Sequence, residues 1–445
     1  MRSILVCACI SVFILSCRQK NDYKTYLHDP VTYCKTVYEL NTVVMGNNFS
    51  PIVASRNYLY ANVAAYEVIA AGYPQEYRSL AGQVKGLSEL PKPPKDKPID
   101  FEFASLLAFC KLGEAVTFPA GSMQYFVDSL HNLAKEHGMP TDIFNNSVAF
   151  ADTVSSVVMQ WSKKDFYLQT RTYPKYTVMD TPGRWVPTPP AYTSAMEPSW
   201  RMIRPVVMDS ANQFIPPRPP KFNLDKNSLY FKEVMAIKNA GDSLSDEQKH
   251  IAEFWDDNPF KLNVTGHVMF GTKKFSPPGH WMSIVGIAAK KSNADFPKTV
   301  YAFAVTSIAL FDAFIQCWDE KYRSNCVRPE TVINKYIDAD WRPLLQTPPF
   351  PEYTCGHSTC SSSAAEALTS VFGDNFAYTD TTETEFGIKS RSFTSFRQAA
   401  EENNWARFYG GIHFHNSCIV STEYGRKVGQ LVVNKLNMKK NYATK

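Results

Sequence analysis

The chain has 445 residues, of which 44% are hydrophobic and 20% are charged, and its formal net charge is +5. This composition excludes an intrinsically disordered chain, and the length suits one large domain or two of medium size. The positive charge is modest and no long run of Lys and Arg occurs, so the sequence does not indicate a nucleic-acid partner. We expect any concentration of positive charge to be local, at a binding site for an anion.

The first residues are typical of an export signal. Arg2 gives a positive start, residues 4–15 form an apolar stretch too short to span a bilayer, and Cys17 follows Ser16. A Cys in this position resembles the cleavage box of bacterial lipoproteins, which implies that Cys17 is lipidated. We therefore expect a lipoprotein signal peptide over 1–17, export to the bacterial cell envelope, and membrane attachment through this lipid anchor only. An ordinary signal peptide with an incidental Cys is the alternative. We expect no later stretch to be long and apolar enough to span a membrane.

The cysteines do not indicate a disulfide framework or a zinc site. Seven of the ten lie after residue 17, and an odd number leaves at least one thiol unpaired. They are scattered, and neither Cys-x-x-Cys nor His-Glu-x-x-His occurs. A structural or catalytic zinc ion is therefore not expected.

Apolar residues at helical spacing predict helices along most of the first half. The predicted ranges are 29–44, 52–71, 101–112, 123–136 and 142–161. The period of 3.6 residues fits these stretches better than strict alternation does, so the sequence predicts an all-α fold.

Residues 170–220 differ from the segments before them. They hold eleven of the 29 prolines, which excludes long helices. They also contain Trp185 and Trp200, which a solvated linker rarely needs. We expect an ordered, extended segment that wraps a helical body, and that ends an N-terminal half over 18–220. The C-terminal half then covers 221–445.

Helices are predicted to resume where Ser243 or Ser245 can cap a helix. His280 follows Pro-Pro-Gly at another helix start, where capping or packing is the expected role. Residues 300–318 are apolar on nearly all sides, which predicts a buried central helix. Asp312 within it is either a core acid with a partner or a partner for a nearby Arg of the site.

Three patterns that carry chemistry follow in order after this helix. They are Lys321-x6-Arg328-Pro329, Phe350-x4-Cys355-Gly356-His357, and Arg407-x5-His413. This ordered set resembles the motifs shared by vanadium-dependent haloperoxidases, type 2 phosphatidic acid phosphatases and bacterial acid phosphatases. The wider block from Pro348 to Tyr353 resembles the haloperoxidase branch. The resemblance implies a fold of two helical bundles, with the extended Pro-rich segment between the halves.

The resemblance also implies a site for a tetrahedral oxyanion. Its predicted ligands are Lys321, Arg328, Cys355, Gly356 and Arg407. Arginine forks bind pairs of oxygens and a helix N-terminus at Gly356 adds amide donors, which suits an anion with several charges. His413 would attack phosphorus in a phosphatase or coordinate vanadium, as the metal ligand, in a haloperoxidase. His357 would be the general acid/base, and Phe350, Asp312 and Ser417 are candidates for supporting roles.

Two departures from the motifs bear on turnover. Cys355 stands where the family has Ser, and a thiol is a weaker hydrogen-bond donor. Ser417 stands where the family has an Asp that holds the nucleophilic His, and Ser carries no charge. A smaller departure is Ala406 in place of Ser.

Three functions follow as alternatives. The first is a vanadate-dependent peroxidase that oxidises halide with hydrogen peroxide, with vanadate as its cofactor. The second is an exported phosphomonoesterase that uses a phosphoryl-histidine intermediate and no cofactor. The third is a surface lipoprotein that binds vanadate or phosphate with little turnover. In each case the partner is a small molecule.

Overall fold

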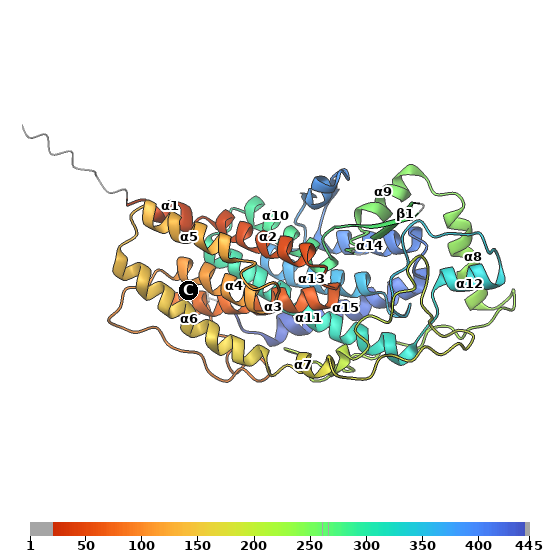
Figure 1. Ribbon diagram of the computed structural model, residues 1–445, viewed down its shortest axis with the longest axis horizontal. Helices are drawn as coiled ribbons and strands as arrows, with labels where there is room; N and C mark the ends of the chain where they lie inside the picture. Colours follow the sequence, from red (N-terminus) through yellow and green to blue (C-terminus); the bar gives the residue numbers. More distant parts are fainter. Residues whose placement is uncertain (1–20, 260, 266, 441–445) are drawn as a thin grey trace, which may run out of the picture.

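The computed structural model describes residues 21–259, 261–265 and 267–440. The predicted signal peptide and Cys17 lie outside these residues, so the signal peptide and the lipidation of Cys17 stay predictions. The described part is mostly helical and elongated, with the N-terminal helices at one end and α8 and α12 at the other (Figure 1). The predicted all-α fold is confirmed, with small two-stranded sheets as additions.

Helices of the N-terminal half match the predicted ranges closely. They are α1 (Tyr23–Leu27), α2 (Pro30–Gly46), α3 (Pro51–Gly72), α4 (Phe101–Ala115), α5 (Gln124–Glu136), α6 (Thr141–Ser162) and α7 (Tyr167–Thr170). Local signals explain where they begin. The side chains of Asp29, Ser50 and Asp100 accept hydrogen bonds from amides in the first turns of α2, α3 and α4.

The C-terminal half contains the longest helix of the described residues, α11 (Phe296–Ser324). Its other helices are α8 (Leu229–Gly241), α9 (Asp246–Phe254), α10 (Pro277–Lys291), α12 (Pro329–Tyr336), α13 (Gly356–Phe372), α14 (Phe396–Tyr409) and α15 (His415–Lys435). Ser245 caps α9 in a capping box with Gln248, as one of the two predicted caps. Short 3-10 turns occur at Trp200–Met202 and Thr382–Phe386.

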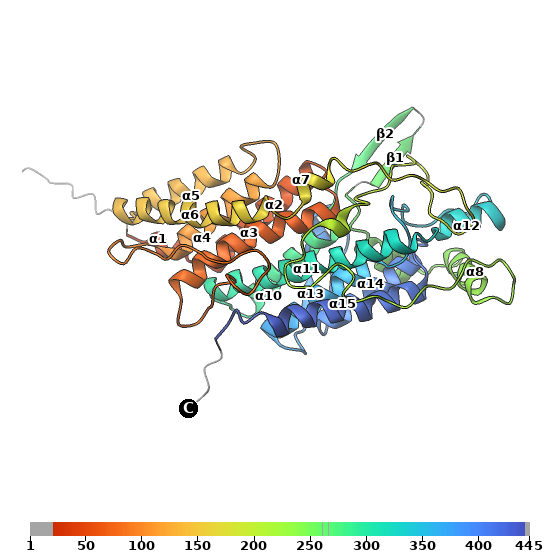
Figure 2. The same cartoon turned by 90° about the horizontal axis from the view of Figure 1, so that it is seen from below.

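Two antiparallel hairpins accompany the helices. Strand β1 (Lys261–Thr265) pairs with β2 (Val268–Thr272), and β3 (Tyr378–Asp380) pairs with β4 (Arg391–Phe393). The first hairpin projects from the helical body (Figure 2). The second places Asp380 in the interior, beside α10.

Helix α11 is the buried central helix that the sequence predicts. It is long and apolar enough to cross a membrane by length and composition, with a mean hydropathy of 1.6 over its most apolar window. The expectation that no later stretch has these properties is therefore wrong. However, 94% of that window is buried inside the protein, because α11 packs against α3, α10, α13 and α15. This is the position of a core helix in the fold.

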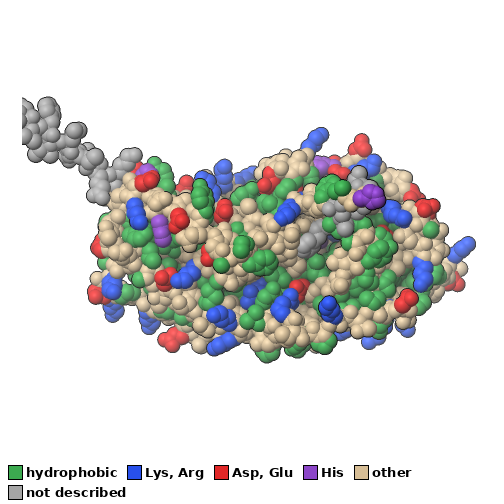
Figure 3. All heavy atoms as spheres, in the orientation of Figure 1, with side chains coloured by type: hydrophobic (Ala, Val, Ile, Leu, Met, Phe, Trp, Pro, Cys, Tyr) green, Lys and Arg blue, Asp and Glu red, His purple; other side chains and the backbone are tan. Residues whose placement is uncertain are grey.

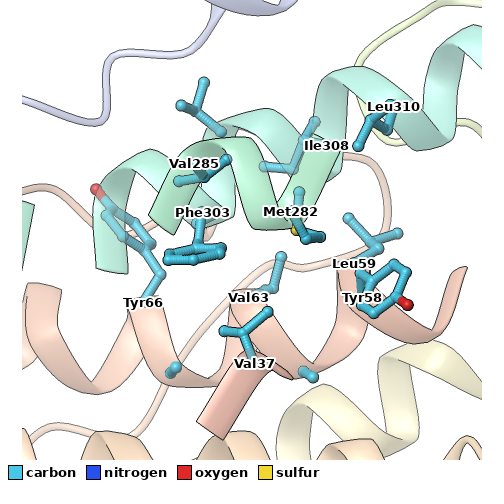
Figure 4. Close-up of a cluster of buried hydrophobic side chains, with 14 of the residues drawn as sticks. Val37, Tyr58, Leu59, Val63, Tyr66, Met282, Val285, Phe303, Ile308 and Leu310 are labelled. Atoms are coloured by element: carbon cyan, nitrogen blue, oxygen red, sulfur yellow. The ribbon is translucent and has the colours of Figure 1, made fainter. Parts of the chain in front are cut away.

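One hydrophobic core runs through both halves of the chain. Val63 of α3 packs in the same cluster as Met282 of α10 and Phe303 of α11 (Figure 4). The expected boundary at residue 220 therefore does not separate two hydrophobic cores, since residues from both sides of it share one cluster. On the face in Figure 3, charges of both signs are interspersed.

Residues 171–199 contain no helix or strand, in agreement with their prolines, and the segment is anchored by buried aromatic rings. Trp185 and Trp200 are fully buried. Asp312 of α11 binds the backbone that follows residues 171–199. Its carboxylate accepts hydrogen bonds of 2.7–2.9 Å from the amides of Val206, Val207 and Met208. The structure therefore gives Asp312 backbone partners and not an arginine of the site. All seven cysteines in the described residues are free thiols.

Candidate oxyanion site

Five segments bring the predicted site residues together. Lys321 lies in the last turn of α11, and Arg328 precedes α12. Helix α13 begins at Gly356, as predicted, so His357 lies in its first turn. Arg407 lies in the last turn of α14, and His413 lies in the turn between α14 and α15.

Lys321 and Arg328 are fully buried and are held by carbonyls of the segment before α13. Lys321 Nζ donates to the carbonyls of Pro351 (2.8 Å) and Glu352 (3.1 Å). Arg328 Nε donates to the carbonyl of Phe350 at 2.8 Å. The Phe350 ring lies under both cations, 4.8 Å from Lys321 Nζ and 5.0 Å from Arg328 Cζ. Burial lowers the pKa of Lys321 to about 8 and that of Arg328 to about 10.

Arg407 and His357 face the same cavity from two helices. Arg407 Nη1 donates to the carbonyls of Trp255 (2.5 Å) and Asp256 (3.2 Å). Burial and the Arg407 charge together hold the pKa of His357 well below its usual range. His357 is therefore neutral at pH 7 and can accept a proton.

His413 is fixed by contacts at both ring nitrogens. Its Nδ1 lies 2.8 Å from Glu352 Oε1, and its Nε2 lies 3.0 Å from Arg328 Nη1. An ionised carboxylate can only accept a hydrogen bond, so we assign the proton to Nδ1. Nε2 then accepts a hydrogen bond from Arg328 Nη1, and a ligand that binds this lone pair would replace that contact.

Glu352 supplies a carboxylate partner for His413, which the family motif places at position 417. Its Oε1 also accepts from the Phe414 amide at 3.2 Å. Ser417, the position where the family motif has Asp, does not contact His413; its hydroxyl has no hydrogen-bond partner among the described residues, and it lines a different cavity. His413 precedes α15, so residue 417 is not one helical turn away from it. Glu352, and not residue 417, therefore supplies the carboxylate partner of His413, and the effect of Ser417 on turnover stays a prediction.

Three buried polar atoms of the site lack hydrogen-bond partners within the described part of the chain. Two are donors, Arg328 Nη2 and Arg407 Nε, and the third is His357 Nε2, which becomes a donor when it takes up a proton. A buried donor without a partner costs about 1–3 kcal/mol, so such groups indicate a ligand. Together with Lys321 and the first amides of α13, they provide the donors that a tetrahedral oxyanion such as vanadate requires.

Cys355 occupies the predicted position directly before α13. Its amide donates to Ser421 Oγ at 2.8 Å, and its thiol is fully buried beside Cys418 and His413. Burial opposes ionisation, but hydrogen bonding from Cys418 and the neighbouring His413 lower the pKa of Cys355 overall. A Cβ at Gly356 would meet Trp318 at an ordinary contact distance of 3.4 Å. Packing alone does not require glycine there, so its predicted role as an amide donor stays a prediction.

The sequence did not indicate Glu352 or Asp257 as site residues. His280 was expected only to cap a helix or to pack. Glu352 lies inside the second motif, but nothing in its spacing indicates which histidine it reaches. Asp257 follows α9, about a hundred residues before His357, and its Oδ2 lies 3.8 Å from His357 Nε2. Only the tertiary fold brings them together.

Comparisons with known proteins agree with this geometry. Residues 301–441 match the family described as the VCPO second helical-bundle domain. The fold is similar to the crystal structure of the first bacterial vanadium-dependent iodoperoxidase, with 45% identity, a TM-score of 0.88, and coverage of 93% of this chain and 98% of that one.

A holo-type bacterial vanadium-dependent chloroperoxidase has 17% identity and a TM-score of 0.65, with coverage of 87% of this chain and 93% of that one. Its apo-type structure has 18% identity and a TM-score of 0.64, with coverage of 87% and 94%. These two show likeness of fold. No significant match is found among curated proteins.

Proposed function

The chain belongs to the vanadium-dependent haloperoxidase family, and from this premise we propose that it binds vanadate and uses hydrogen peroxide to oxidise a halide. Iodide is the halide we propose first, because the similar solved structure is that of an iodoperoxidase. The observation that carries the proposal is the group of unpartnered buried donors around His413 Nε2.

Each site residue has a role in this proposal. Lys321, Arg328, Arg407 and the amide of Gly356 would hold the vanadate oxygens, and His413 Nε2 would be the ligand to vanadium. Bound vanadate would activate peroxide as a two-electron oxidant of halide. His357, which is neutral and lines the same cavity, would accept a proton from the incoming peroxide and then donate it to the oxygen that leaves as water.

The phosphatase and binding-only alternatives become outcomes of one test. The purified chain from residue 18 is assayed with iodide, bromide or chloride in the presence of peroxide, with and without vanadate, and for phosphate release from a phosphomonoester. We expect iodide oxidation that requires vanadate and is inhibited competitively by phosphate, since both anions use one site. Phosphate release without any halide oxidation would contradict the proposal and favour the phosphatase.

We also propose that the protein is exported and held to the bacterial cell envelope by a lipid on Cys17. The support is the sequence Ser16-Cys17 directly after the apolar stretch. Cys17→Ser in the full chain should abolish incorporation of a labelled fatty acid, whereas the control Cys9→Ser should retain it. Labelling that persists in Cys17→Ser would refute the anchor.

A further inference from the structure

His280 of α10 is held between two carboxylates in the interior. Its side chain is fully buried, with Nδ1 2.8 Å from Asp257 Oδ1 and Nε2 2.9 Å from Asp380 Oδ2. The Trp255 ring stacks on it at a centroid distance of 4.8 Å. Because ionised carboxylates can only accept, both ring nitrogens carry protons and His280 is an imidazolium. Burial opposes this charge, but Asp257 and Asp380 raise the pKa of His280 well above its usual value.

Further charged groups surround this pair of contacts. Glu383 Oε1 lies 3.8 Å from His280 Nδ1, and Lys274 Nζ lies 3.8 Å from Glu383 Oε2. Burial raises the pKa of Glu383 to about 8, so this carboxyl is largely protonated at pH 7. Asp257 and Asp380 are therefore left as the counter-ions of His280.

Asp257 connects this cluster to the oxyanion site. Its Oδ1 contacts His280, whereas its Oδ2 is buried without a hydrogen-bond partner in the described part of the chain and lies 3.8 Å from His357 Nε2. Both residues line the same cavity. The backbone of Asp257 has a φ of 44°, a left-handed conformation that costs free energy outside glycine.

Resting on the proposed function, we propose that His280 is a positioning residue: held by Asp380, it keeps Asp257 Oδ2 facing His357 Nε2, so that the proton His357 accepts is stabilised by the Asp257 carboxylate. The chemistry needs this support because Arg407 and burial both disfavour a charged His357. A carboxylate within about 4–6 Å favours the charged form of a base by roughly one pKa unit or more.

The test is an NMR titration of His357 in the purified chain with saturating inorganic phosphate, which occupies the site without turnover. We expect Asp257→Asn and His280→Gln each to lower the pKa of His357 by about one unit. The pH dependence of kcat/KM for iodide oxidation should shift by the same amount. His131→Gln, a histidine of α5 far along the chain from the site, is the matched control and should leave the His357 titration unchanged.

Several outcomes decide the matter. If His280→Gln does not fold, Asp380→Asn, which preserves shape, should give a shift in the same direction. An unchanged pKa of His357 in folded Asp257→Asn and His280→Gln would overturn the proposal. So would a tightly held divalent cation that is lost in Glu383→Gln, because a metal ion would then neutralise these carboxylates in place of His280. The titration needs no halide oxidation, so it stays readable if the peroxidase assignment fails.

Discussion

Arg328→Ala and Arg407→Ala are each expected to weaken vanadate and phosphate binding ten- to a hundredfold. Each arginine is almost fully buried and has a donor without a partner in the described structure, Arg328 Nη2 and Arg407 Nε. A hydrogen bond to a charged group contributes about 1.5–3 kcal/mol, which corresponds to roughly that change in affinity. Isothermal titration calorimetry with each anion measures it.

The double variant should lose between about a hundredfold and ten-thousandfold in affinity, if the two losses add. Arg328 also contacts His413 Nε2, so a deviation from additivity would report that contact. Arg56→Ala is the matched control, since Arg56 is buried and paired with Asp165 in the N-terminal half. It should change stability but not anion affinity. Wild-type affinity in both single arginine variants would exclude the site described above.

Glu352→Gln is expected to lower vanadate affinity by roughly ten- to a hundredfold, the usual effect of removing a residue that orients a metal-binding histidine. The Glu352 carboxylate keeps the proton of His413 on Nδ1 and leaves Nε2 free. An amide at position 352 can donate to Nδ1 instead, which moves the proton to Nε2 and prevents coordination.

Phosphate binding should fall much less in Glu352→Gln, because phosphate uses the cationic donors and needs no bond from the imidazole. The ratio of the vanadate affinity to the phosphate affinity therefore distinguishes a change in the His413 tautomer from a general loss of structure in the site. Ser417→Ala is the control and should change neither affinity, since Ser417 lines another cavity. Equal losses for both anions in Glu352→Gln would contradict the assigned role of Glu352.

The predicted oxyanion ligands lie in short motifs, and their assignment came from the resemblance of those motifs to a known family. Lys321 and Arg328 flank the end of one helix and the start of the next, and Gly356 begins a helix that the motif itself indicates. Helix starts were predictable because their signals are local: the Ser245 cap and its Gln248 partner lie three residues apart.

The carboxylate partners of the buried histidines could not be read from the sequence, because the tertiary structure alone decides them. The carboxylate that orients His413 comes from Glu352, some sixty residues earlier, and not from position 417, because the chain turns before α15 begins. Likewise, His280 reaches Asp380 and Asp257 across separate elements. The sequence by itself determined which segments are helical and which side chains are candidates for binding an anion, since both depend on patterns along the chain. Which carboxylate meets which buried histidine depends on how distant segments pack, and only the folded core determines that.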